Sequence, residues 1–233
     1  MDIPGLLLRS FWPMFRAGLL VTVPLTIISF ICGLILAFLV ALMRRSNFKP
    51  VSGLAAFFVW IIRGTPLIVQ LFVIFYGLPK VGLVFSPFIS AVIGLSVSQG
   101  AYNSEIIRSA LASINKGQWE ASKALGMSKA QTMRYVVVTQ AALVAVPPLG
   151  NSFIGLLKDT SLVATLTVAE IFQIGQQIVA VTYEPLWLYI EVAMVYLIFS
   201  TLLTYLQSFL EKKLGRHLVP VEHKIAKKPL PSA

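Results

Sequence analysis

Long apolar segments alternate with short basic segments along the chain. Four segments carry no charged side chain: residues 17–43, 81–104, 135–157 and 192–210. A fifth, residues 54–76, is interrupted only by Arg63. About 20 apolar residues are needed for a helix to cross the hydrocarbon core of a bilayer. The pattern therefore predicts five membrane-spanning helices.

Two shorter segments do not fit a membrane-spanning helix. Residues 160–183 are apolar overall, but they contain Glu170 and three glutamines, which favours short helices at one interface. Residues 6–15 contain Trp12, and tryptophan favours the headgroup level of a membrane. We predict an interfacial helix there, ahead of the first span.

The composition agrees with an all-α integral membrane protein. Of the 233 residues, 57% are hydrophobic and only 12% are charged, whereas a soluble domain carries charge on about a quarter of its residues. The net charge of +10 resides in the segments between apolar runs, which argues against a nucleic-acid partner. We therefore expect the lipid bilayer to be the surroundings of residues 1–219, read as a single transmembrane domain.

The basic residues predict an orientation, because short cytoplasmic loops are enriched in Lys and Arg. They cluster after the first span, between the third and fourth spans, and after the fifth span. The N-terminus is then expected outside and the C-terminus inside. Residues 220–233 form a basic tail that is predicted to be disordered in the cytoplasm.

No catalytic or metal-binding constellation is evident in the sequence. The lone cysteine, Cys32, lies in an apolar run, and the two histidines, His217 and His223, lie near the basic tail. No glycine-rich phosphate-binding loop with its lysine is present, so any ATP and Mg²⁺ are expected on another chain.

The cytoplasmic loop at residues 109–134 carries the end signals of two short helices. Asn115 with Gln118, and Ser128 with Gln131, have the spacing of capping boxes, and Gly126 suits a left-handed residue after a helix. An ordinary amphipathic loop on the headgroups is the alternative interpretation.

Within this loop, Glu120-Ala121-Ser122 followed by Gly126 resembles the Glu-Ala-Ala loop of permease subunits of ATP-binding cassette importers. Ser122 replaces the second alanine of that pattern, and Thr139 stands where it usually ends in proline. The resemblance implies a coupling helix that docks into an ATPase subunit. The implied docking residues are Trp119, Glu120, Ala121, Ser122, Leu125 and Gly126.

Three further stretches resemble the polar amino acid branch of that family: residues 63–67 with Gln70, residues 100–105 with Arg108, and residues 158–162. The resemblance implies a type I importer fold, a second permease subunit, two ATPase subunits that bind ATP and Mg²⁺, and an extracytoplasmic substrate-binding protein. It also implies the bacterial cytoplasmic membrane, with L-cystine as the best guess for the substrate.

A charged side chain within a span requires water, a partner or a substrate. Arg63 stands beside Gly64 and Pro66, which interrupt a helix, and Asp159 could supply the complementary charge. The expected substrate-pathway residues are Arg63, Thr65, Gln70, Asn151, Asp159, Thr160 and Ser161.

Structural alternatives stay open for each of these residues. Arg63 could pair with Glu105 or a backbone carbonyl, Lys158 could neutralise Asp159, and Ser or Thr hydroxyls could bond to their own helix. Glu105 and Arg108 are expected to brace the coupling loop. An ion-coupled secondary transporter or a channel subunit is the alternative function.

Overall fold

The computed structural model describes residues 2–215, and every regular element there is helical. The first two helices, α1 (Ile3–Ala17) and α2 (Val23–Arg44), are joined by a π-helical turn at Gly18–Thr22 into one helix of 42 residues. The prediction of a separate interfacial helix at residues 6–15 is therefore wrong. The ring of Pro24 would clash with the backbone of the preceding turn in a regular α-helix. The π-helical turn before it is wider, and the helix therefore continues without a break.

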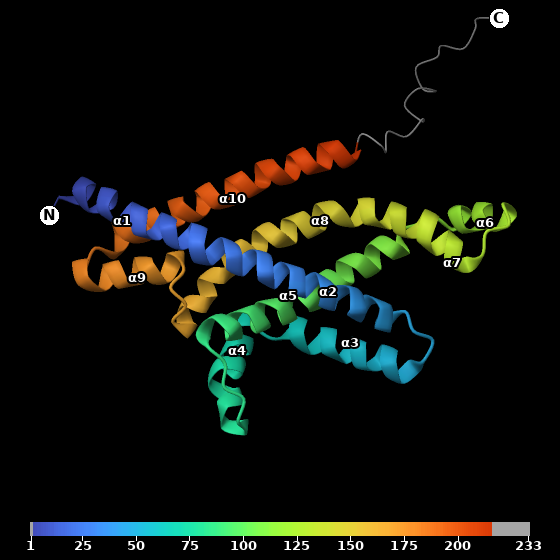
Figure 1. The fold of residues 1–233 in the computed structure, drawn as a ribbon, viewed down its shortest axis with the longest axis horizontal. Helices are drawn as coiled ribbons and strands as arrows, with labels where there is room; N and C mark the ends of the chain where they lie inside the picture. The colour runs from blue at the N-terminus through green and yellow to red at the C-terminus, as the bar shows by residue number, and fades with distance from the viewer. Residues whose placement is uncertain (1, 216–233) are drawn as a thin grey trace, which may run out of the picture.

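The predicted span at residues 54–76 is broken. Helix α3 (Lys49–Gly64) is followed by α4 (Leu67–Phe72), a π-helical turn at Val73–Gly77 and a 3-10 turn at Leu78–Val81, and the two parts meet at 106°. Thr65 is extended because the residue before a proline is kept out of the helical region. Figure 1 shows α4 projecting away from the other helices.

Helix α5 (Pro87–Ala112) lies in the middle of the molecule and packs along α2. Its buried side chains are partly polar: Ser90, Ser96, Ser98, Gln99, Asn103 and Ser104. By length and composition, three described helices suffice to cross a membrane, or four if the bent pair counts as one span. Helix α5 is not among them because its polar residues lower its mean hydropathy, so the count of five stays a prediction.

Small residues bring α2 and α5 into close contact. A Cβ atom on Gly33 would lie 2.6 Å from the Gln99 Cβ atom, and one on Gly100 would lie 2.6 Å from a methyl carbon of Leu36. The Ser96 hydroxyl donates to the Ser29 carbonyl at 3.2 Å across the same contact. Glycine and serine at helix contacts allow this approach where the hydrophobic effect between helices is weak.

Residues 109–134 contain the two predicted helices, α6 (Lys116–Ala124) and α7 (Lys129–Gln131). Asn115 caps α6, and Ser128 and Gln131 form the expected capping box. Gln118 does not complete a box with Asn115; its side-chain oxygen accepts from Gln140 instead.

After α7 the chain stays helical through a π-helical turn at Thr132–Val137 into α8 (Val138–Asp159). The predicted short helices follow as a 3-10 helix at Thr160–Leu166 and α9 (Ile171–Thr182). Helix α10 (Pro185–Gly215) completes the described chain, and the predicted tail at residues 220–233 lies outside it.

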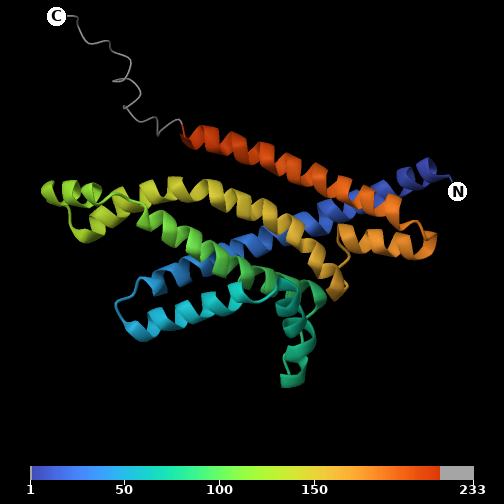
Figure 2. The ribbon, with the colours of Figure 1, turned by 180° about the vertical axis from the view of Figure 1, so that it is seen from behind.

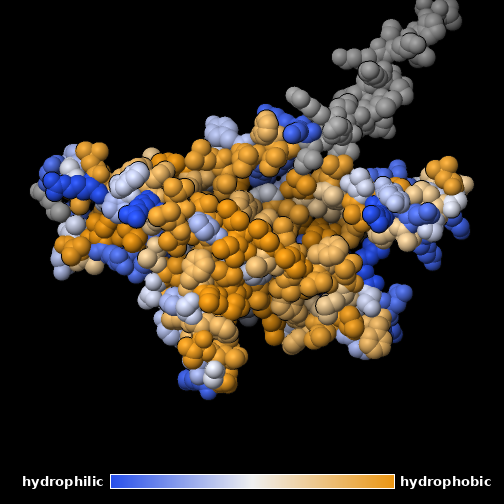
Figure 3. Space-filling view, viewed as in Figure 1, coloured by the Kyte–Doolittle hydropathy of each residue, from blue (hydrophilic) through white to orange (hydrophobic). Residues whose placement is uncertain are grey.

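The N-terminal half of the long first helix packs against α9 and α10, as both ribbon views show (Figures 1 and 2). Met14, Leu157 and Ile171 are fully buried in this core. The face of the molecule in Figure 3 is apolar in the middle of the long axis and more hydrophilic toward both ends of that axis. Such a band suits contact with lipid hydrocarbon between two polar layers.

Candidate functional site

A cavity of about 910 Å³ lies mainly between α5 and α8. Its lining follows α5 from Ser98 to Ser113 and α8 from Asp159 back to Val144. At the rise of an α-helix, each of these stretches is about 22 Å long. The cavity is therefore an elongated groove that covers much of the thickness of a bilayer core.

Of the predicted pathway residues, Arg63, Asn151 and Asp159 line this cavity together. Arg63 ends α3 beside the break, and its guanidinium carbon lies 5.3 Å from the centre of the Tyr102 ring. This cation–π contact stabilises the charge without neutralising it. Within residues 2–215, Arg63 forms no ion pair, so the alternative of a salt bridge to Glu105 is not realised.

Asp159 is the last residue of α8 and is half-buried in the cavity wall. The chain stays helical past Asp159, so the carboxylate lies where α8 passes into the 3-10 helix at Thr160–Leu166. No ion pair joins it to Lys158 in the described chain. Within the described residues, the Asp159 carboxyl group therefore lines the cavity without an ion-pair partner.

A polar cluster that the sequence reasoning missed forms the wall between α5 and α8. The Ser152 hydroxyl lies 2.7 Å from both Gln99 Oε1 and Asn103 Oδ1, and Asn103 Nδ2 donates to Gln99 Oε1 at 3.1 Å. The available signal was Gln99 and Asn103 one helical turn apart in an otherwise apolar segment. These hydrogen bonds connect α5 to α8, and Gln99 and Ser152 add polar groups to the cavity wall.

Four other predicted pathway residues do not line the cavity. Gln70 Nε2 donates to the Ile62 carbonyl at 2.8 Å and to the Thr65 carbonyl at 3.1 Å, which satisfies backbone groups freed at the break. Thr160 and Ser161 donate to carbonyls three residues earlier at 2.6 and 2.8 Å. These contacts match the alternative in which hydroxyls bond to their own helix.

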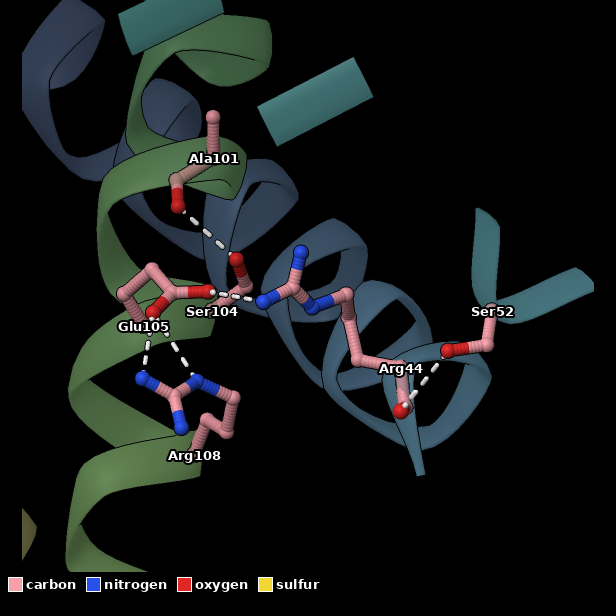
Figure 4. Close-up of polar contacts among 6 residues, drawn as sticks. All are labelled: Arg44, Ser52, Ala101, Ser104, Glu105 and Arg108. Carbon is pink, nitrogen blue, oxygen red and sulfur yellow. Dashed lines mark hydrogen bonds and ion pairs between the residues drawn. The ribbon is translucent and has the colours of Figure 1, made fainter. Parts of the chain in front are cut away.

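Glu105 lies about midway along the α5 lining of the cavity, and two arginines contact its carboxylate (Figure 4). Arg108 donates to Glu105 Oε2 through Nε at 2.9 Å, and its Nη2 atom lies 2.8 Å from the same oxygen. Arg44, at the end of α2, approaches Glu105 Oε1 at 3.5 Å. Sequence reasoning grouped Glu105 with Arg108 but missed Arg44, which is remote in sequence.

The predicted coupling loop at residues 109–134 is largely exposed. Leu125 is 81% exposed, Glu120 and Ala121 are exposed, and Trp119 is half-buried. Ser122 is buried and donates to the Gln118 carbonyl at 2.7 Å.

The end of α6 is a Schellman motif, as Gly126 and the residue after it bond back to the helix. The Gly126 N–H donates to the Lys123 carbonyl at 3.0 Å and the Met127 N–H to the Ser122 carbonyl at 3.1 Å. Gly126 has a φ of 76°, which confirms the predicted left-handed residue. Gln118 and Gln140, 3.0 Å apart, connect α6 to α8.

Known proteins match nearly the whole chain. Residues 29–216 match the family described as binding-protein-dependent transport system inner membrane component. The chain is 46% identical to the L-cystine transport system permease protein TcyB of Bacillus subtilis, over 90% of each chain. It is 36% identical to the glutamine transport system permease protein GlnP of Escherichia coli K12, over 87% of this chain and 93% of that one.

Two solved structures have the same fold. The crystal structure of an amino acid ABC transporter with histidines matches with a TM-score of 0.85 and 34% identity, over 91% of this chain and 99% of that chain. An inward-facing MetNI methionine ABC transporter matches with a TM-score of 0.67 over 92% and 99%, and at 22% identity it supports the fold alone. The chain belongs to the family of binding-protein-dependent transport system inner membrane components, and it is a multi-pass membrane permease subunit of an ABC importer.

Proposed function

We propose that this subunit forms the pathway for a polar amino acid, with L-cystine as the substrate, and that the cavity between α5 and α8 is that pathway. The observation that carries the proposal is that Arg63 and Asp159 line one cavity and that neither forms an ion pair within residues 2–215. Every amino acid carries a carboxylate and an ammonium group, so a site that binds both requires one positive and one negative side chain.

Arg63 would receive the substrate carboxylate, because a guanidinium matches the geometry of a carboxylate. Asp159 would receive the ammonium group. Asn151 lines the same cavity, and its side-chain oxygen accepts from Gln207 at 3.1 Å, which fixes the direction of its amide toward α10. Thr65, Gln70, Thr160 and Ser161 would support the shape of the pathway through backbone contacts.

The choice of L-cystine rests on the cystine permease relative and on the charges of the cavity. One end of a cystine molecule would place its carboxylate at Arg63 and its ammonium group at Asp159, both of which line the cavity. Its volume of about 910 Å³ accommodates a two-headed amino acid.

The same proposal assigns ATP hydrolysis to partner subunits. An ATPase that binds ATP and Mg²⁺ would contact α6 through Trp119, Glu120, Ala121, Leu125 and Gly126, with Ser122 packed beneath them. A substrate-binding protein would deliver the amino acid from outside, and a second permease subunit would complete the pathway. The location is the bacterial cytoplasmic membrane, with the N-terminus outside and the C-terminus inside.

The test is uptake of labelled L-cystine by proteoliposomes that contain the permease, its ATPase and its binding protein. Unlabelled glutamine, glutamate, arginine and histidine serve as competitors. The assignment is supported if excess unlabelled cystine strongly reduces the uptake of labelled cystine and the other four amino acids do not. Stronger competition by another amino acid would move the substrate to that amino acid, and the absence of any amino acid uptake would overturn the proposed pathway.

A further inference from the structure

The carboxylate of Glu105 lies about midway along the cavity and connects α5 to α2, and a hydrogen bond to the backbone of Arg44 extends this connection to α3. Glu105 lies on α5, Arg44 ends α2, and the Arg44 carbonyl accepts from the Ser52 hydroxyl of α3 at 3.2 Å. Figure 4 shows these side chains converging from the three helices. A movement of α5 would therefore be transmitted to the turn between α2 and α3.

The two oxygens of Glu105 have different surroundings. Oε2 is contacted by two nitrogens of Arg108 at 2.8 and 2.9 Å. Oε1 is buried without a hydrogen bond, although Nη2 of Arg44 is only 3.5 Å away. A charge-assisted hydrogen bond is about 2.7–2.9 Å long. The contact between Arg44 and Glu105 is thus an ion pair that a small inward shift would turn into a hydrogen bond.

The position of Glu105 relates this incomplete contact to the coupling loop. Glu105 lies two helical turns before the end of α5, a distance of about 10 Å. Only a short turn separates that end from Asn115, the cap of α6. Any rigid displacement of α6 by an ATPase is therefore passed to α5 and reaches Glu105 before it reaches Arg63.

We propose that Arg44 is a positioning residue for transport. It closes onto Glu105 when α5 moves, and so it draws the α2–α3 turn along with the coupling helix. The inference rests on the proposed function, since it requires an ATPase that moves α6. It adds a second cytoplasmic element, the α2–α3 turn, to the transmission of that movement. Because Arg44 neither lines the cavity nor belongs to the docking surface, its loss should lower the import rate and leave substrate affinity unchanged.

The test compares Arg44→Gln with Arg45→Gln in reconstituted complexes. Arg45 is the adjacent exposed arginine, and within residues 2–215 it forms no ion pair, so it controls for a lost positive charge. We expect Arg44→Gln to lower the maximal import rate about two- to five-fold, the factor that a partly exposed ion pair corresponds to. The KM for the amino acid and the rate of ATP hydrolysis should stay unchanged, so more ATP is used per substrate imported.

A double-substitution cycle separates positioning from a general structural role. If Arg44 acts through Glu105, then Arg44→Gln should have no further effect on import in a Glu105→Gln background. Arg44→Lys keeps the charge and should restore part of the lost rate. Equal import by Arg44→Gln and wild type, or additive losses in the cycle, would overturn the inference. A wild-type complex that shows no ATP-dependent import would overturn the proposed function and this inference with it.

Discussion

Gly126 offers the sharpest prediction because its surroundings isolate one physical effect. A Cβ atom there would meet no atom within 4 Å, so a substitution causes no clash with a neighbour. The cost comes only from φ, which is 76° and is disfavoured for residues with a Cβ atom. For alanine this cost is about 1–2 kcal/mol, which corresponds to a roughly five- to thirty-fold shift in equilibrium.

We expect this cost to appear in the affinity for the ATPase. The Schellman motif at Gly126 ends α6 and fixes the surface that would dock. In Gly126→Ala the chain must adopt the strained turn to bind, so ATPase binding should weaken about five- to thirty-fold. Gly126→Asn is the matched control, since asparagine tolerates the left-handed conformation and should bind within about two-fold of wild type. Gly126→Asp adds charge beside the docking surface and should abolish transport while membrane insertion stays normal.

The assay is titration of purified ATPase onto immobilised permease in detergent, with equal loading of each variant. Wild-type affinity for Gly126→Ala would refute the role of the left-handed turn. If Gly126→Asn were as weak as Gly126→Ala, side-chain contact at the docking surface, rather than backbone strain, would explain the result.

Three other substitutions test separate parts of the structure. Gly33→Ala should lower the thermal unfolding midpoint in detergent, because its Cβ atom would press on α5 at a cost of about 1–3 kcal/mol, whereas Gly53→Ala, with no atom within 4 Å, should not. Asp159→Asn should raise the KM for amino acid uptake about ten-fold or more without loss of ATPase binding, and an unchanged KM would return Asp159 to a structural role. Ser128→Ala removes a capping-box acceptor worth about 1 kcal/mol, so hydrogen exchange at the start of α7 should be about five-fold faster, and equal exchange would contradict the cap.

The local signals of the sequence were sufficient to predict the helix ends within residues 109–134. Asn115, Gly126 and Ser128 act on neighbours within a few residues, so their identity and spacing determine helix ends before any tertiary contact forms. The break at Thr65 was also accessible, because Pro66 restricts the residue before it. The bend of 106° was not, since its direction depends on packing against other helices.

The parts that could not be predicted depend on contacts between distant segments. Arg44 and Glu105 are joined only because α2 and α5 pack closely through Gly33 and Gly100. Likewise, the grouping of Arg63 with Asp159 was proposed from chemistry, and only the fold shows that both line one cavity.

The central claim is that this permease moves an amino acid because a partner ATPase drives it. The most direct measurement is accumulation of labelled L-cystine in proteoliposomes that contain the permease, its binding protein and either active or hydrolysis-deficient ATPase, without an ion gradient. The account predicts accumulation above the external concentration with active ATPase only. Accumulation with the hydrolysis-deficient ATPase once an ion gradient is imposed would contradict it and would favour an ion-coupled transporter.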